Sequence, residues 1–219
     1  MTSNKTLEYR KKRSKVILRV LKKLFPEAKM ALKFRNNWQM YVAVVLSAQC
    51  TDKRVNEVTR ELFKKYRTLE DYVRADAKAF EQDIRPTGFY KNKAKNILAG
   101  AKVVKEKFGG KLPKTMDEML TIPGVGRKTA NILLCQAHGQ VVGIPVDTHV
   151  RRLAKKFRLT NHTDVAKIER DLMEILPKKE WCDFTFRLID YGRKFSPAHK
   201  VASEEDPISR ALLHVSRTT

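Results

Sequence analysis

An all-α fold is predicted for this chain of 219 residues. Apolar residues recur with the 3.6-residue period of a helix in almost every segment, and the connections between these segments are short. Convincing strands with alternating apolar residues are absent, because "QVVGIPV" at 140–146, the one β-like stretch, is interrupted by Gly143 and Pro145. The length allows one large domain or two smaller lobes, each with its own core.

The first half of the chain predicts four helices. Residues 17–24 place their apolar side chains on one face, and 38–49 is apolar nearly all round, which indicates a buried central helix. The period resumes after Asp52, a residue type that is preferred at helix N-caps. A further helix over 94–108 is expected to end at the two glycines 109–110.

The second half of the chain continues the helical period. The pattern predicts five helices, at Met116–Leu120, Arg127–Ala137, Thr148–Phe157, Val165–Leu176 and Trp181–Asp190. The final stretch, 200–219, mixes charge with a weak pattern and is expected to be a loosely held tail.

The charge points to a polyanionic partner. The chain has 46 Lys and Arg against 24 Asp and Glu, a formal net charge of +22, and self-repulsion on that scale disfavours compactness unless a polyanion binds. Basic clusters in 1–35, 91–96 and 151–158 are each typical of a solvated helix face, but together they favour a nucleic-acid surface. No apolar run approaches the roughly 20 residues that span a bilayer, and no signal-peptide core is present. We expect a monomer without membrane association, cytoplasmic (at the nucleoid) if prokaryotic, with a nuclear location as the alternative.

A helix-turn-helix pattern stands at 116–137, "MDEMLTIPGVGRKTANILLCQA". Pro123 is expected to stop the first helix, and Gly124 and Gly126 allow positive φ and a close approach of another backbone. The second helix would begin at Arg127, with its N–H groups forming a site for one phosphate. A nucleotide-hydrolysing P-loop is excluded, because that motif follows a strand and has a different spacing. A plain turn between two helices is the structural alternative.

Lys128 lies in the first turn of that second helix. The helix dipole and the adjacent Arg127 both disfavour its positive charge, which favours the neutral, nucleophilic amine that a Schiff base requires. A lysine that only contacts phosphate is the alternative.

Asp147 precedes the helical pattern of "VDTHVRRL" (146–153), where its side chain is expected to cap the helix. N–H donors would keep the carboxylate ionised and rigid. Such a group is suited to stabilise a positive sugar transition state or to accept a proton. Capping alone is the alternative.

Four segments in order carry a resemblance to a known family. "LTIPGVGRKTAN" (120–131) and "VDTHVRRL" look like the helix-hairpin-helix and the Gly/Pro-rich loop with Asp of the endonuclease III family of DNA glycosylases. "VVLSAQCTDKRVN" (44–56) and "TGFYKNKAKNI" (87–97) also resemble segments of that family. The similarity extends from about residue 15 to Arg193.

The resemblance implies two helical lobes with a DNA-binding cleft between them. Residues 30–141 would form a six-helix lobe that contains the hairpin, and 1–29 would join 142–219 in a second lobe. Lys128 would then face Asp147 across the cleft.

The resemblance also implies how duplex DNA with a damaged base or an abasic site is bound, since an enzyme that acts on a base must flip it out. Gln49 would enter the gap, and Phe89 with Tyr90 would wedge the base stack; ordinary core burial is the alternative for Phe89. His149 would support the pocket, unless it is only structural. The remaining DNA-binding candidates are the hairpin residues and one basic residue near the wedge: Gly124, Val125, Gly126, Arg127, Thr129 and Lys91.

The chemistry implied by the resemblance is that of a bifunctional DNA glycosylase and AP lyase in base excision repair. The Lys128 amine would displace the base from the sugar C1′, Asp147 would stabilise the positive charge, and β-elimination would cut the strand 3′ to the lesion. Oxidised pyrimidines are the usual substrates of this branch. The alternatives are a monofunctional glycosylase for uracil or mismatched thymine, and a non-catalytic helix-hairpin-helix protein.

One departure from the family concerns its iron–sulfur cluster. Family members commonly have four cysteines after a segment like "LIDYGR", whereas this chain continues "KFSPAHKVASEEDPIS" without any. Because a [4Fe–4S] cluster needs thiolates in close array, no cluster is expected. No other metal or cofactor is expected either.

Overall fold

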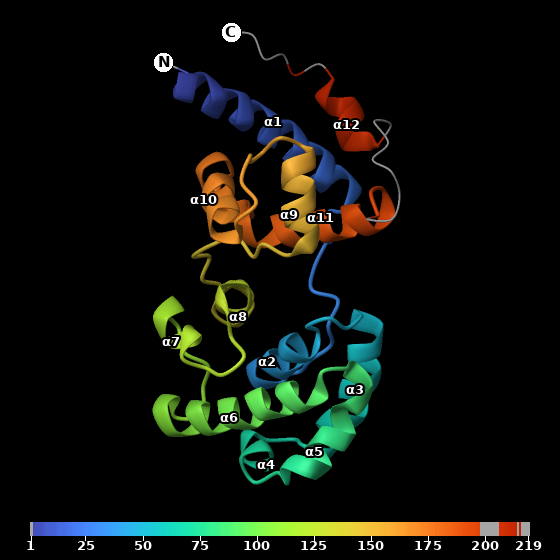
Figure 1. Ribbon diagram of the computed structural model, residues 1–219, viewed down its shortest axis with the longest axis vertical. Helices are drawn as coiled ribbons and strands as arrows, with labels where there is room; N and C mark the ends of the chain where they lie inside the picture. Colours follow the sequence, from blue (N-terminus) through green and yellow to red (C-terminus); the bar gives the residue numbers. More distant parts are fainter. Residues whose placement is uncertain (1, 198–205, 214, 216–219) are drawn as a thin grey trace. The chain divides into compact units, whose positions relative to one another are not determined.

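A computed structural model describes residues 2–197, 206–213 and 215 of the protein (Figure 1). The α-helices in this part of the chain are α1 (Thr2–Leu24), α2 (Asn37–Leu46), α3 (Asp52–Lys65), α4 (Leu69–Val73), α5 (Ala77–Ile84), α6 (Tyr90–Phe108), α7 (Met116–Leu120), α8 (Arg127–His138), α9 (Thr148–Lys156), α10 (Val165–Ile175), α11 (Trp181–Lys194) and α12 (Pro207–Leu212). Two short 3-10 helices, η1 (Arg85–Thr87) and η2 (Lys178–Glu180), precede α6 and α11. The described residues form no strand, and the predicted all-α fold is confirmed.

The chain divides into two compact lobes. Residues 31–142 form one of them, called here the contiguous lobe, and 1–30 together with 143–219 form the other, called the composite lobe. The family resemblance implies divisions at 29/30 and 141/142, whereas the structure has them at 30/31 and 142/143. No helix among the described residues is long and apolar enough to cross a membrane.

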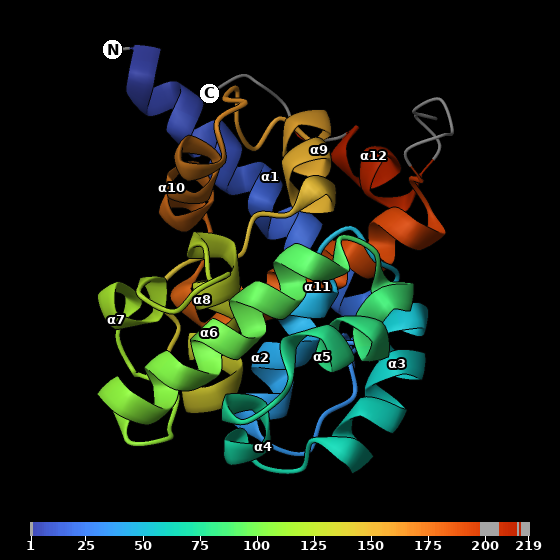
Figure 2. The ribbon, with the colours of Figure 1, turned by 60° about the horizontal axis from the view of Figure 1, so that its bottom comes forward.

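The contiguous lobe is organised around α2. Every residue of α2 from Gln39 to Leu46 is buried, as the apolar run 38–49 predicts, although the helix ends at Leu46. Helices α4 and α5 pack against α6, and α7 packs against α8 (Figures 1 and 2). Fully described residues 31–142 contain seven α-helices, α2 to α8, where six are predicted. The count of six comes from the family resemblance, whereas the apolar period predicts neither α4 nor α5. Helix α4 is a single short turn that Thr68 and Asp71 stabilise with a reciprocal capping box.

The composite lobe is organised around α1 and α11. Ile17 and Leu21 of α1 are fully buried in one core with Phe184 and Leu188 of α11 and Val150 of α9. Helix α12 packs along α1, and α9 packs on α11 (Figure 1). Both ends of the described chain therefore contribute to one core, which the middle of the sequence does not enter.

Two local predictions need correction. The N-cap of α3 is Thr51 and not Asp52, since the Thr51 side chain accepts from the backbone N–H of Arg54 and Asp52 already lies in the helix. The expectation of a loosely held tail is wrong for 206–213, where α12 begins after the buried cap Asp206 and buries Ile208 and Leu212. The predicted tail's residues 200–205, 214 and 216–219 lie outside the described residues.

Candidate functional site

The hairpin loop joins α7 to α8 as the sequence predicts. The Val125 N–H donates to the Ile122 carbonyl oxygen at 3.0 Å, and both side chains are buried. Gly124 has φ +81°, and a Cβ there would lie 3.0 Å from the Asn96 side chain, so both conformation and space require glycine. The sequence allows positive φ at Gly126 as well, but this residue does not adopt it. Its φ is −92°, and no atom lies within 4 Å of an added Cβ, so this position is open to a close approach.

Gly126 is the N-cap residue of α8 and provides no side-chain oxygen for the N–H groups of the first turn. Arg127 and Lys128 are exposed in that turn, and Thr129 is half-buried. The positive end of the helix dipole and these cations form an electropositive surface at the hairpin. Its chemistry suits a phosphate, with the Lys128 amine at the surface beside it.

Tyr41 of α2 holds the hairpin from inside the lobe. Its hydroxyl lies 2.8 Å from the Pro123 carbonyl oxygen and 3.2 Å from that of Asn96, and burial raises the pKa of Tyr41 far above its ordinary value. The hydroxyl therefore remains a donor. A Cβ on Gly100 would lie 2.3 Å from this oxygen, so Gly100 of α6 provides the space for it. Sequence reasoning overlooked Tyr41, although a tyrosine in an apolar helix signals a buried polar partner.

Asp147 is the N-cap residue of α9, as predicted. Its Oδ1 accepts from the Val150 N–H at 2.7 Å, and its carbonyl oxygen accepts from the Arg151 N–H at 2.8 Å. The side chain is half-buried. A carboxylate fixed in this way has one defined orientation, with its second oxygen available to other chemistry.

His149 lies in the first turn of the same helix and is half-buried. Its Nδ1 is buried, and the described residues offer it no hydrogen-bond partner. Burial lowers the pKa of His149 below 6.5, partly offset by Asp147 and reinforced by Arg152 and Arg193. The imidazole is therefore neutral at pH 7. A Cβ on Gly192 of α11 would lie 2.5 Å from Nδ1, so His149 packs directly on that glycine.

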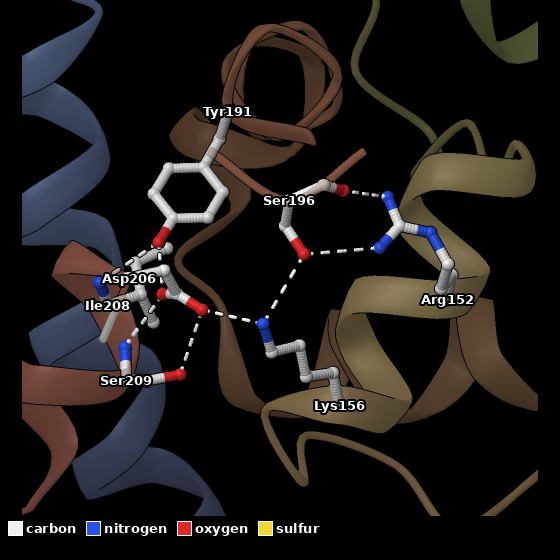
Figure 3. A network of polar contacts seen from close by, with 7 residues as sticks. All are labelled: Arg152, Lys156, Tyr191, Ser196, Asp206, Ile208 and Ser209. Atoms are coloured by element: carbon white, nitrogen blue, oxygen red, sulfur yellow. Dashed lines mark hydrogen bonds and ion pairs between the residues drawn. The ribbon is translucent and has the colours of Figure 1, made fainter. Parts of the chain in front are cut away.

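A buried polar network centred on Asp206 fixes the other end of α9 (Figure 3). Asp206 accepts from Lys156 Nζ at 2.6 Å and from the Tyr191 hydroxyl, and it caps α12 through the Ser209 N–H at 2.9 Å. Arg152 Nη2 donates to the Ser196 carbonyl oxygen at 2.6 Å. The network ties the described parts of the C-terminal segment to α9, the helix that Asp147 caps. No spacing in the sequence predicts it.

The Gln49 and Phe89 segments share an unusual backbone. Gln49 has φ 52° and Phe89 has φ 48°, both in the left-handed region that non-glycine residues rarely adopt. Gln49 is exposed, and Phe89 is 63% exposed, so core burial is excluded as the explanation for this phenylalanine. Tyr90, half-buried, and Lys91, exposed, begin α6 directly after it. Two strained, exposed tips of this kind are typical of functional positions.

The candidate residues are divided between the lobes. The hairpin, Lys128 and the Gln49 and Phe89 segments belong to the contiguous lobe, whereas Asp147 and His149 belong to the composite lobe. The chain crosses from one lobe to the other at 142/143, between Lys128 and Asp147.

Comparisons with known proteins cover these segments. The family model described as "HhH-GPD superfamily base excision DNA repair protein" matches residues 42–178. The endonuclease III of Synechocystis sp. is 45% identical over 191 residues, 87% of this chain and 87% of that protein. A solved non-covalent endonuclease III–DNA complex has a TM-score of 0.87 at 42% identity and covers 92% of this chain and 94% of that one. A trapped endonuclease III–DNA covalent intermediate has a TM-score of 0.86 at 42% identity, covering 90% and 93%.

Proposed function

Because the chain belongs to the endonuclease III family of the HhH-GPD superfamily, we propose that Lys128 is its nucleophile and that Asp147 assists the attack. The protein is a DNA glycosylase with AP lyase activity that acts in base excision repair on duplex DNA with damaged bases. Oxidised pyrimidines are the lesion class proposed for it.

One observation carries the assignment of Lys128. The lysine is exposed in the first turn of α8, next to the hairpin surface that suits a phosphate. A phosphate held there would bring the sugar of a neighbouring nucleotide within reach of the amine. A related endonuclease III forms a covalent intermediate with DNA, which requires a nucleophilic side chain, and the ε-amine of Lys128 is a suitable one.

The proposed reaction begins with attack of the Lys128 Nζ lone pair on C1′ of the damaged nucleotide. The bond from C1′ to the base breaks, its electron pair leaves with the base, and the base takes up a proton. Asp147 stabilises the positive charge that develops on the sugar and accepts a proton from the amine. The C1′–O4′ bond then breaks as O4′ takes up that proton, and the open sugar is left as a protonated Schiff base, which acidifies the proton on C2′. Loss of that proton expels the 3′ phosphate oxygen and cuts the strand, and water then releases the lysine.

DNA binding is proposed to use the exposed residues of the contiguous lobe. Main-chain N–H groups at the start of α8 in the hairpin, from Arg127 to Thr129, hold one phosphate in register, while the Val125 N–H stays bonded to Ile122 within the loop. Gln49 fills the gap left by the flipped nucleotide, and Phe89 with Tyr90 wedges the stack. Lys91 adds a phosphate contact, and the neutral His149 supports the Asp147 segment.

We propose that this activity needs no iron–sulfur cluster. The chain has no cysteine after Cys182. Among the described residues, the Asp206 network provides a protein-only attachment for the C-terminal segment (Figure 3). Iron and sulfide analysis of purified protein should find neither, and a chelator should leave strand cleavage unchanged. Loss of cleavage with the chelator contradicts the proposal.

Borohydride trapping on abasic-site DNA tests the catalytic assignment. Wild type should give a covalent adduct that Lys128→Ala abolishes. Arg127→Ala is the matched control, since it removes a neighbouring exposed cation and should weaken binding while leaving the adduct. Asp147→Asn should slow base release by about 10²-fold or more, because it removes the charge and the proton acceptor. An adduct that survives Lys128→Ala overturns the assignment.

Base release measured beside strand nicking separates the proposal from its alternatives. A monofunctional glycosylase releases uracil or thymine without nicking, and a non-catalytic binding protein releases no base. A panel of duplexes with oxidised pyrimidines, uracil and mismatched thymine also determines the preferred lesion. The bacterial relative favours a cytoplasmic location at the nucleoid, which fluorescence microscopy can test.

A further inference from the structure

Lys93 is a buried cation in the contiguous lobe that the proposed reaction does not use. It lies in the first turns of α6 and is only 5% exposed. Its Nζ donates to the carbonyl oxygens of Leu46 and Thr87, each at 2.8 Å. Burial lowers the pKa of Lys93, and the neighbouring Cys50 partly offsets the effect. Burying an ammonium is costly unless it is hydrogen-bonded, and Lys93 is held in place by these two bonds. A cation kept at such a position is expected to have a structural or functional role.

Both acceptors are the last residues of helical segments. Leu46 ends α2, and Thr87 ends η1. The carbonyl ends of helices carry partial negative charge and lack intrahelical donors, so one ammonium satisfies two of them at once. Lys93 therefore joins two chain segments that are 41 positions apart (87 − 46).

Each of these ends leads directly into one of the two exposed tips. Gln49 comes three residues after Leu46, and Phe89 comes two residues after Thr87. The left-handed conformation of such a non-glycine residue is unfavourable and persists only where the surroundings determine it. The segments 47–51 and 88–89 are called here the Gln49 loop and the Phe89 loop. Fixing their starting points is a direct way to hold both tips.

We propose that Lys93 is a positioning residue whose single ammonium holds the starts of both the Gln49 loop and the Phe89 loop. The Gln49 and Phe89 side chains would then enter the DNA duplex together, in a geometry that is set before binding. The proposal rests on the proposed insertion of Gln49 and Phe89 into DNA. It adds that the two insertions are coupled and that a residue without contact to DNA sets their geometry. Preset inserting groups lower the ordering cost of flipping a paired nucleotide.

Lys93→Met tests the coupling, because methionine keeps the apolar stem and removes the ammonium. Lys105→Met is the matched control. It makes the same change of charge in the same helix, at an exposed lysine that pairs with Glu70. Two substrates are compared under single-turnover conditions: a duplex with thymine glycol opposite adenine, and an abasic site in a duplex that lacks the opposite nucleotide. The DNA base pair must be opened before the enzyme reacts with the first substrate, but not before it reacts with the second.

Lys93→Met should slow base release from the paired lesion about tenfold, the effect of about 1.4 kcal/mol, and should leave borohydride trapping at the opened abasic site unchanged. The fluorescence rise of 2-aminopurine placed beside the lesion should slow equally, because it reports unstacking. Lys105→Met should match wild type on both substrates. An equal loss on both substrates, or no loss on the paired one, overturns the proposal. Failure of wild type to form any adduct would instead overturn the proposed function.

Hydrogen exchange of the wild-type protein tests the coupling if Lys93→Met does not fold. Backbone amides of the two loops should then exchange through a common opening, with one free energy and one denaturant dependence, because a single ammonium holds both. Separate opening free energies for 47–51 and 88–89 overturn the proposal.

Discussion

Each lobe contains a lysine and a tyrosine that donate to one aspartate, but the two trios differ in burial. In the contiguous lobe, Asp83 accepts from Lys65 at 2.6 Å and from the Tyr66 hydroxyl at 2.8 Å, and its side chain is 28% exposed. In the composite lobe, Asp206 accepts from Lys156 at 2.6 Å and from Tyr191, and its side chain is 2% exposed. An exposed pair contributes little to stability, whereas removing one partner of a buried pair leaves an uncompensated charge. Loss of the aspartate is therefore expected to lower stability more in the composite lobe than in the contiguous lobe.

The difference follows from how each lobe is assembled. The composite lobe joins α1 to helices more than 100 positions away, and donors on α1 reach carbonyl oxygens at the ends of those helices. Arg13 Nε donates to Phe157 at 2.8 Å, and Ser14 Oγ donates to Ile175 at 2.8 Å. The contiguous lobe uses the same device at Lys93, which reaches the segments that lead to its two exposed tips. Helix ends are thus the attachment points in both lobes.

The largest change is expected from Asp206→Ala. The substitution leaves the half-buried Lys156 ammonium without its carboxylate and removes the cap of α12, so the free energy of unfolding should fall by about 3 kcal/mol. Urea denaturation followed by circular dichroism measures it. A loss below that of the corresponding change at Asp83 contradicts the contrast between the lobes.

The pH dependence of stability should come from the same buried pair. Burial alone would raise the pKa of Asp206, but hydrogen bonds from Lys156, Tyr191 and Ser209 outweigh it and hold the pKa below 3.8. This contribution is therefore fully present above pH 3.8 and is lost as the pH falls through the lower folded value. In urea denaturation at a series of pH values, the difference between wild type and Asp206→Asn should shrink in that acidic window. A difference that is constant with pH contradicts the assignment.

A smaller loss is expected in the contiguous lobe from Gly100→Ala. The new Cβ would lie 2.3 Å from the Tyr41 hydroxyl oxygen, so Tyr41 must move away from Pro123. The free energy of unfolding should fall by about 1–3 kcal/mol. Binding of abasic-site DNA should weaken with it, because the hairpin loses its internal donor. Tyr41→Phe is the control, and the two changes should combine less than additively. Additive losses would mean that Gly100 acts on something other than Tyr41.

The smallest change is expected from Asp83→Ala. Its partner Lys65 is exposed and remains hydrated after the substitution, so the unfolding free energy should change by about 0–1 kcal/mol. The same urea denaturation measures it beside Asp206→Ala. A loss as large as that of Asp206→Ala would show that burial does not separate the two trios.

Local patterns predicted the elements well. The helix at Met116–Leu120 has the predicted bounds, Gly109 ends α6 in a left-handed conformation as the paired glycines suggest, and Asp147 caps α9. Short helices were missed where capping decides, as at α4, since one turn carries too little period to be read. At Gly126 the sequence allows positive φ, but the residue adopts φ −92°, because a glycine permits positive φ without requiring it.

The sequence by itself determined the helical class, the hairpin with Lys128 at the start of its second helix, the cap at Asp147 and the absence of cysteines after Cys182. These features depend on residues within one or two turns of each other. Only the tertiary structure decided that Tyr41 holds the hairpin across 82 positions, that Lys93 reaches Leu46 across 47, and that Asp206 reaches Lys156 across 50. The physical reason is that a buried donor needs an acceptor near it in space, and no spacing along the chain records which acceptor that will be.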